Sequence, residues 1–366
     1  MGFRARVGAA LLLAAAALGA PAAVARDATT VGQGTWHKVA TEPYRLNNKQ
    51  DAIAFANPRV GLYGNGTGRI FRTKDGGAHW RLAWRKAGTY VRSLEFADGR
   101  TAFMGNVGPG YFDDVTDRQP LYVTHDAGTT WTPVMGWSGP AVAGLCALDA
   151  LEQDGKLITI RAGGRVGGPA ALLESFDGGT SWQSRDMSAV TGMILDIHFV
   201  DARTGFIAGA SQSDEGKAHA RILKTTDGGA TWRAVYDSPR AGDNNWKLAF
   251  PSAAIGYATI ISYDAPVAEA RGYVVKTEDG GEHWRPLVVT RDHDWVPYGI
   301  AFISVDRGWV GGSTGGYETT DGGAHWRAVP MGLSTNKLRI LPRPDGGRTI
   351  FALGHDLYRL DLPPSP

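Results

Sequence analysis

Short runs of apolar residues, some continuous and some alternating with polar residues, follow one another along most of the chain. Clusters rich in glycine and aspartate separate them, and this pattern is typical of β-strands joined by tight turns. The clearest series consists of Met193–Val200, Phe206–Gly209 and Arg221–Lys224. The same order of runs recurs between Asp51 and Arg72 and between Gly299 and Glu318. The pattern predicts an all-β chain built from repeated groups of strands.

An octet with the consensus Ser/Thr-x-Asp-x-Gly-x-x-Trp follows each group of runs and occurs six times. Its aspartates and tryptophans are Asp75 and Trp80, Asp126 and Trp131, Asp177 and Trp182, Asp227 and Trp232, Asp279 and Trp284, and Asp321 and Trp326. Successive aspartates lie 51, 51, 50, 52 and 42 residues apart. A regular period of this kind indicates a repeat fold, and four strands per period make one blade of a β-propeller.

The octet has the composition of a turn that satisfies its own hydrogen bonds. Its aspartate can accept bonds from the backbone N–H groups that follow, the Ser/Thr hydroxyl adds a local bond, and glycine tolerates a positive φ. The tryptophan begins the next strand and carries an indole that buries roughly 150 to 250 Å². We therefore expect each octet to join the third and fourth strands of a blade and each indole to pack against a neighbouring blade.

The two ends of the repeat region complete the count of blades. After the sixth octet only three runs remain, at Asn336–Leu341, Thr349–Leu353 and Leu357–Leu360. We predict that residues 35–40 supply the missing fourth strand and so remove an exposed sheet edge. The predicted fold is a single seven-bladed β-propeller of four-stranded antiparallel blades over residues 34–360, closed by both chain ends and followed by a tail at 361–366.

Composition and charge narrow the range of functions. The 50 glycines among 366 residues exceed the usual share of about 7%, as frequent tight turns require. The formal net charge is only +2 and no long basic run occurs, so strong general binding of nucleic acid is not indicated. No motif of a Ser or Cys nucleophile, a metalloprotease or a phosphate-binding loop occurs. We expect no cofactor, no metal and no catalytic residue.

The first 25 residues have the features of a signal peptide. Arg4 and Arg6 precede the apolar stretch Val7–Leu18, which is short for a membrane span, and Ala23–Ala25 provides a cleavage signal. We expect cleavage after Ala25, a periplasmic or secreted monomer and no stable membrane span after signal removal. A short N-terminal anchor is the alternative. Cys146 is the only cysteine, so no intramolecular disulfide can form, and we expect a buried thiol.

The octet is the Asp-box, or BNR repeat, that sialidases, some secreted glucanases and sortilin-type receptors share with the photosystem II stability/assembly factor family. The chain most closely resembles that last family, because nearly every blade has a box and phrases such as Ile197–Gly209 and Ala301–Gly312 recur. The resemblance covers Gly34–Leu360. It implies a non-catalytic exported platform that binds or assembles an extracytoplasmic protein, with carbohydrate as a second class of partner.

The alternative implied by the box is a secreted glycoside hydrolase of the sialidase type. Such enzymes resemble this chain in their boxes and add an arginine triad for the substrate carboxylate, a Tyr–Glu pair and an acidic Asp. The nearest match to their first arginine phrase is Tyr44-Arg45-Leu46-Asn47, which lacks the usual proline. The expected aspartate is also misplaced, because only Asp51 occurs between Arg45 and the first box.

If the boxes are structural, the function belongs to the loops on the opposite face. These loops join second to third strands and one blade to the next. They are longest in blades two to five, at Asn106–Gln119, Arg161–Pro169, Ser211–Ala220 and Ser262–Gly272. We expect a partner to bind in this sector.

The candidate binding residues combine arginines that can hold carboxylates with aromatic and acidic side chains. They are Arg45, Arg92, Tyr111, Asp113, Asp114, Arg165, Arg240, Trp246, Arg271, Trp295 and Tyr298. Trp246 and Trp295 are expected in loops between blades. Independently solvated arginines, a loop packed on itself and tryptophans that only seal the blades are the structural alternatives. Cation sites at Asp113 and Asp114 or at Asp292–Asp294 lack visible further ligands.

Overall fold

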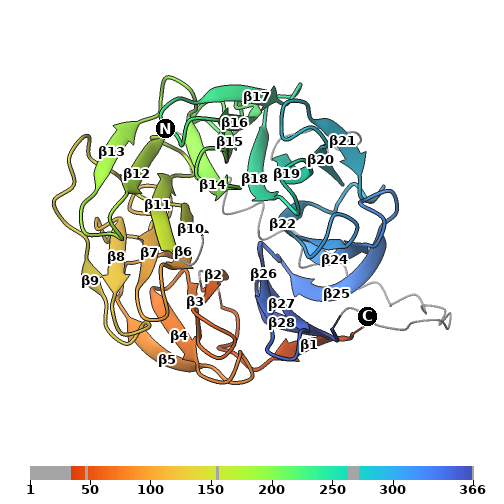
Figure 1. The fold of residues 1–366 in the computed structure, drawn as a ribbon, viewed down its shortest axis with the longest axis horizontal. Helices are drawn as coiled ribbons and strands as arrows, with labels where there is room; N and C mark the ends of the chain where they lie inside the picture. The colour runs from red at the N-terminus through yellow and green to blue at the C-terminus, as the bar shows by residue number, and fades with distance from the viewer. Residues whose placement is uncertain (1–33, 46–47, 154–155, 263–271, 365–366) are drawn as a thin grey trace. The chain divides into compact units, whose positions relative to one another are not determined.

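Seven four-stranded antiparallel sheets form the part of the chain that the computed structural model describes, residues 34–45, 48–153, 156–262 and 272–364. The sheets follow one another around a ring (Figure 1), and these residues contain no α-helix. The predicted all-β, seven-bladed propeller is therefore confirmed. The proposed signal peptide at 1–25 lies outside the described residues.

Each blade takes four strands, with the first strand of the sheet nearest the ring axis (Figure 1). Blades one and two contain β2 (Gln50–Phe55), β3 (Gly61–Asn65), β4 (Arg69–Thr73), β5 (Arg81–Arg85), β6 (Val91–Phe96), β7 (Ala102–Asn106), β8 (Leu121–Thr124) and β9 (Thr132–Pro133). Blades three and four contain β10 (Ala147–Gln153), β11 (Lys156–Gly164), β12 (Ala171–Ser175), β13 (Gln183–Asp186), β14 (Met193–Phe199), β15 (Gly205–Ala210), β16 (Ala220–Thr225) and β17 (Arg233–Asp237).

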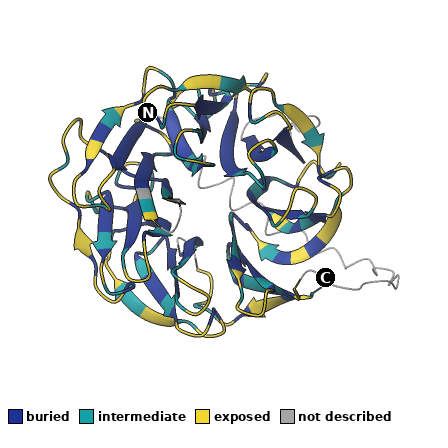
Figure 2. Ribbon diagram, in the orientation of Figure 1, coloured by how far each residue is buried: buried dark blue, intermediate teal, exposed yellow. Residues whose placement is uncertain are grey.

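The remaining three blades repeat this order. Blades five and six contain β18 (Asp243–Ala249), β19 (Gly256–Ser262), β20 (Tyr273–Thr277), β21 (Arg285–Val288), β22 (Pro297–Phe302), β23 (Gly308–Gly312), β24 (Thr314–Thr319) and β25 (Arg327–Leu333). Blade seven contains β26 (Lys337–Pro342), β27 (Arg348–Leu353), β28 (Leu357–Leu362) and β1 (Trp36–Val39). The second and third strands are mostly buried and the outermost strands are largely exposed (Figure 2).

The last blade closes the ring as predicted. Strand β1 pairs antiparallel with β28 over all four of its residues, from Trp36 opposite Leu360 to Val39 opposite Leu357. Trp36 is buried with apolar residues of blades six and seven, whereas His37 and Lys38 face solvent. Val39 at the other end of the strand is buried with apolar residues of blade one, so β1 contacts both neighbouring blades.

The hydrogen bonds expected from the octet are present in all six boxes. The Ser/Thr hydroxyl donates to the aspartate at 2.7–2.9 Å and accepts from the backbone N–H of the second glycine position at 2.8–2.9 Å. The aspartate also accepts the backbone N–H four residues on, at 2.8–3.0 Å. In the first box this N–H, from His79, lowers the pKa of Asp75 to about 2.

The box tryptophans pack between blades, as the sequence predicted. Trp182 lies edge-on to Phe103 of the preceding blade, with ring centroids 5.3 Å apart, and Trp284 lies in the same way on Phe206. The other four indoles join apolar clusters that also include residues of the preceding blade. The box is thus a structural hairpin that joins neighbouring sheets.

The boxes mark one face of the propeller. In five boxes the residue after the aspartate donates its backbone N–H to the turn between the first and second strands of the same blade, at 2.8–2.9 Å. Both turns therefore lie on one face, which we call the box face. The loops between second and third strands and between blades emerge on the opposite face, which we call the loop face.

Candidate functional site

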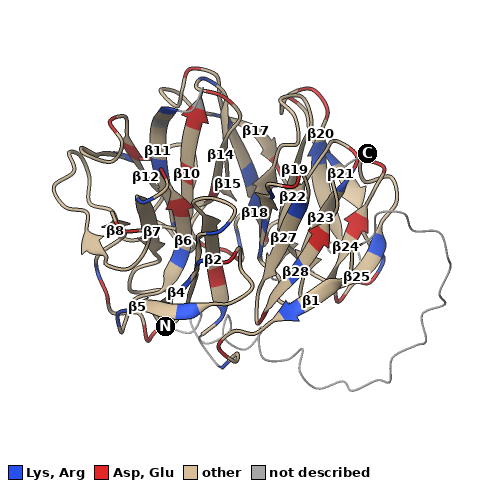
Figure 3. Cartoon of the chain, turned by 60° about the horizontal axis from the view of Figure 1, so that its bottom comes forward, with Lys and Arg blue, Asp and Glu red and all other residues tan. Residues whose placement is uncertain are grey.

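Charged residues are found on the innermost strands, which surround the ring axis. They include Asp51, Arg92, Glu95, Asp149, Asp196, Lys247, Lys337 and Arg339. In Figure 3 both acidic and basic positions are marked on these central strands. Because a charge inside a protein requires a partner or water, the interactions of these residues decide what the centre of the propeller can bind.

At the loop-face end of the axis, Asp51 is the centre of a bonded network. It accepts a hydrogen bond from the Tyr90 hydroxyl at 2.7 Å and pairs with Arg92 at 3.1 Å. Asn336 of blade seven donates to its other oxygen. All four residues are buried. Burial favours the neutral acid, but the charges of Arg92 and Lys49 together with the hydrogen bonds from Tyr90 and Asn336 outweigh that effect, and the pKa of Asp51 is below its ordinary value.

The long loop of blade two, residues 107–120 between β7 and β8, covers this network. Phe112 stacks on Tyr90 with ring centroids 4.8 Å apart, and Tyr111 lies edge-on to Phe112. The Tyr111 hydroxyl is 3.2 Å from each carboxylate oxygen of Glu215, which belongs to the long loop of blade four. Loops of blades two and four are therefore joined on the loop face.

Trp246 completes the set, which we call the mouth cluster and define as Asp51, Tyr90, Arg92, Tyr111, Phe112 and Trp246. The Arg92 guanidinium lies 5.0 Å from the Trp246 ring centroid, a cation–π contact. Trp246, Tyr111, Phe112 and Tyr298 belong to one apolar cluster. Four of the predicted binding residues, Arg92, Tyr111, Trp246 and Tyr298, thus come together.

Arg165 holds the loop of blade two in place. Its guanidinium donates to the carbonyls of Val107 at 3.1 Å, Pro109 at 2.7 Å and Gly168 at 2.9 Å. These bonds occupy the donors that a bidentate carboxylate would need. The structure therefore gives Arg165 a role in positioning the loop.

The other predicted residues are scattered. Arg45 is exposed before blade one, and Asp113 and Asp114 are exposed on the loop of blade two. Trp295 is buried against Tyr317, and Arg240 bonds the Tyr273 hydroxyl at 2.7 Å. Arg271 lies outside the described residues.

Two local expectations about strands and loops were wrong. Trp246 lies within strand β18 and not in a loop between blades. Arg161, expected at the start of a loop, lies in β11 and is buried beside Glu174. Arg161 pairs with Glu174 of its own blade and donates to Gly228 of blade four, and Trp246 of blade five contacts Arg92 of blade two. Cys146 is buried, as predicted.

The Tyr–Glu pair of the sialidase alternative has a counterpart in Tyr111 and Glu215. The arginines nearest to it are already engaged, Arg92 by Asp51 and Arg165 by backbone carbonyls. These residues therefore do not form a free triad for a substrate carboxylate.

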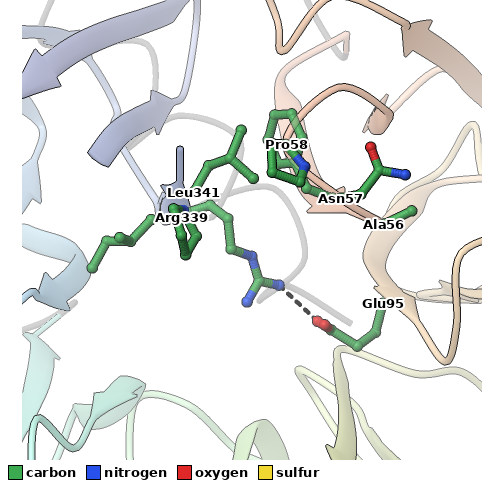
Figure 4. A pocket seen from close by; sticks show the side chains of 9 residues that line it. Ala56, Asn57, Pro58, Glu95, Arg339 and Leu341 are labelled. Atoms are coloured by element: carbon green, nitrogen blue, oxygen red, sulfur yellow. Dashed lines mark hydrogen bonds and ion pairs between the residues drawn. The ribbon is translucent and has the colours of Figure 1, made fainter. Parts of the chain in front are cut away.

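Two cavities lie along the axis, lined mainly by the innermost strands and reaching their box-side ends. The larger has a volume of about 350 Å³ and is lined by charged residues of five blades, Glu95, Asp149, Glu152, Asp196, His198, Lys247, Lys337 and Arg339. We call it the axial cavity. The smaller, of about 270 Å³, lies at the ends of β2 and β26. Glu95 and Arg339 line both cavities and form an ion pair at 2.7 Å (Figure 4).

Asp149 and Lys337 of the axial cavity have no opposite charge bonded to them. The Asp149 Oδ2 atom is buried without a hydrogen-bond partner, and burial raises the pKa of this carboxyl to about 7. Burial also lowers the pKa of Lys337 to about 7. Within the described residues the Lys337 ammonium makes no hydrogen bond or ion pair, and nearby Asp196 is bonded to Lys247 at 3.1 Å.

Asp149 should make the fold less stable as the pH rises. Its folded-state pKa of about 7 exceeds the ordinary value of 3.8, so its contribution is fully present below about pH 4 and is lost between about pH 4 and pH 7. We expect Asp149→Asn to unfold at higher urea concentration than the parent at about pH 7.5, with a smaller difference at about pH 4.5. Equal effects at both pH values would contradict this assignment.

The charged residues that line the axial cavity were not among the binding candidates chosen from the sequence. The available signal was a charge inside an otherwise apolar first strand, as with Asp196 and His198 in Met193–Phe199. Among the described residues no group of three or more His, Cys, Asp or Glu side chains is placed to hold a metal ion. The same ranges contain no helix that is long and apolar enough to cross a membrane.

Comparison with known proteins agrees with the resemblance drawn from the boxes. The family model described as photosynthesis system II assembly factor YCF48 matches residues 147–292. A comparison with curated proteins finds no match. The prediction that the chain is an Asp-box propeller similar to this family is therefore confirmed.

Solved structures share the fold at low identity. A structure described as YCF48 bound to D1 peptide has 15% identity and a TM-score of 0.62, over 90% of this chain and 97% of that chain. YCF48 from Cyanidioschyzon merolae has 15% identity and a TM-score of 0.61, over 89% and 98%. The GH74 enzyme of Niastella koreensis has 17% identity and a TM-score of 0.58, over 84% of this chain and 51% of that one.

Proposed function

We propose that the chain is an exported, non-catalytic platform that binds a segment of an extracytoplasmic protein on its loop face. The observation that carries the proposal is the mouth cluster, where aromatic and arginine side chains of blades two and five lie together under the long loop of blade two. Tyrosine, tryptophan and arginine are the residues most often responsible for binding energy at protein interfaces.

The surroundings of the mouth cluster suit a polar peptide. Tyr111 and Phe112 are half-buried and present part of their rings, while Asp113, Asp114 and Arg45 are exposed on the same face. Tyr44 is 39% exposed and stacks on His355 of blade seven, with ring centroids 3.7 Å apart, which adds another aromatic surface. The similarity to a YCF48 structure described with a D1 peptide supports a protein partner over a carbohydrate.

Peptide selection tests the proposal. A displayed library of random peptides is selected on the immobilised chain, and selected peptides are measured by fluorescence anisotropy. We expect Tyr111→Ala to weaken their binding about tenfold, the usual effect of losing an aromatic contact of about 1.4 kcal/mol.

The matched control is Phe176→Ala, because Phe176 is an aromatic residue 56% exposed in the third box, on the opposite face. It should leave peptide binding unchanged. Equal losses in both variants, or an effect only of Phe176→Ala, would remove the loop face from consideration. Release of product from a fluorogenic sialoside would favour the hydrolase, whereas selective capture of oligosaccharides would favour a carbohydrate partner.

A further inference from the structure

We propose that the axial cavity is a second binding site, which takes a small zwitterion with one ammonium and one carboxylate group. None of the residues that line it belongs to the mouth cluster, although Lys337 follows Asn336, which bonds Asp51. The ion pairs of the cavity leave a buried carboxylate oxygen and an ammonium group without a partner, and these two groups define the ligand.

Most of the charges lining this cavity neutralise one another. Glu95 pairs with Arg339 at 2.7 Å, and Asp196 pairs with Lys247 at 3.1 Å. Lys247 also donates to the Leu195 carbonyl at 3.0 Å, and Arg339 donates to the Ile53 carbonyl at 3.3 Å. These four side chains have their partners within the protein and need no ligand.

Asp149 and Lys337 remain without such partners, and so does Glu152, whose side chain is exposed to solvent and needs none. Asp149, on β10 of blade three, has a buried carboxylate oxygen that accepts no hydrogen bond. Lys337, on β26 of blade seven, makes no hydrogen bond or ion pair with the described residues. No ion pair joins the two, and three steps around the ring separate their blades. Leaving a buried charged group unpaired costs free energy, which a ligand of opposite charge would offset.

The geometry of the cavity restricts the ligand further. Its volume of about 350 Å³ is at the lower end of the range for small-molecule sites, so the ligand is small. A ligand whose ammonium group faces Asp149 and whose carboxylate faces Lys337 would form an ion pair with each of these side chains. The apolar side chains of Leu151, Leu248 and Ile300 also line the cavity and can contact a short carbon chain between the two groups.

The test is isothermal titration calorimetry of the whole chain with glycine, β-alanine and γ-aminobutyrate, whose charges are progressively farther apart. Acetate and methylammonium, at equal ionic strength, carry only one of the two charges. We expect at least one of the three zwitterions to bind and neither single-charge ion to displace it at equal concentration. We expect Asp149→Asn and Lys337→Met each to weaken that binding at least tenfold, since each removes one charge pair.

Several results would overturn the proposal. Acetate binding as tightly as the zwitterions would make the cavity an anion site only, and methylammonium doing so would make it a cation site only. An absence of heat with all three zwitterions would leave a water-filled cavity. The competition experiment uses the unaltered chain, so it remains decisive if a variant fails to fold. Peptide binding on the loop face should be unchanged in Asp149→Asn, which separates this test from that of the proposed function.

Discussion

Trp36→Ala should lower the free energy of unfolding by about 3 to 5 kcal/mol, the usual cost of truncating a buried tryptophan. Trp36 is 8% exposed and packs with Trp309, Met331 and Leu360, so its indole joins the closing strand to blades six and seven. Strand β1 has only four residues, and its loss would leave β28 as an unpaired edge. Urea denaturation followed by circular dichroism measures the effect.

His37→Ala is the matched control, because His37 lies next to Trp36 on the exposed side of the same strand. It should change the free energy of unfolding by less than about 0.5 kcal/mol. If Trp36→Ala were as mild as His37→Ala, closure by β1 would contribute little to the stability of the ring. A large loss in both variants would indicate that the strand responds to any substitution and would not support a specific role of the indole.

Glu174→Leu should cost about 3 to 5 kcal/mol, because it leaves two guanidinium groups without their shared carboxylate. Glu174 is 3% exposed and bonds Arg161 at 3.2 Å and Arg185 at 3.0 Å. Arg161 in turn donates to the carbonyl of Gly228 at 2.9 Å and lies 3.6 Å from the centroid of the Phe199 ring. The carboxylate therefore stabilises an arginine that joins blade three to the box of blade four.

Two further variants show whether the loss comes from the buried charge. The double variant Arg161→Met with Glu174→Leu should recover part of the stability, since an apolar pair can replace a buried ion pair at little cost. Asp237→Ala breaks the more exposed pair with Arg221 and should cost no more than about 1 kcal/mol. A double variant less stable than Glu174→Leu alone would contradict this account.

The repeat could be predicted from the sequence because its causes are local. Each box makes its hydrogen bonds within eight residues, from Thr73 to Trp80 in the first copy, so composition and spacing are enough to recognise the turn. Short apolar or alternating runs between turn residues predicted the strands, and the regular spacing of the boxes predicted the blades. Closure by Trp36–Val39 followed from counting, since only three runs remained after the last box.

The candidate site was predicted only in part. Arg92, Tyr111, Trp246 and Tyr298 were chosen for their residue type and general position, and the structure brings them together. Their partners could not be chosen in this way, because Asn336 lies 285 residues from Asp51 and Glu215 lies 104 residues from Tyr111.

The sequence by itself therefore determined the architecture: the box turns, the strands, the number of blades and the strand that closes the ring. These features depend on backbone hydrogen bonds and on an apolar pattern that repeat within one blade. Only the tertiary structure decided which charges are satisfied. Arg165 donates hydrogen bonds to loop carbonyls and Arg92 forms an ion pair with Asp51. Asp149 and Lys337, on blades three and seven, form no ion pair with any described residue. The ring brings side chains of distant blades together around one axis, and their electrostatic interactions depend on that distance in space.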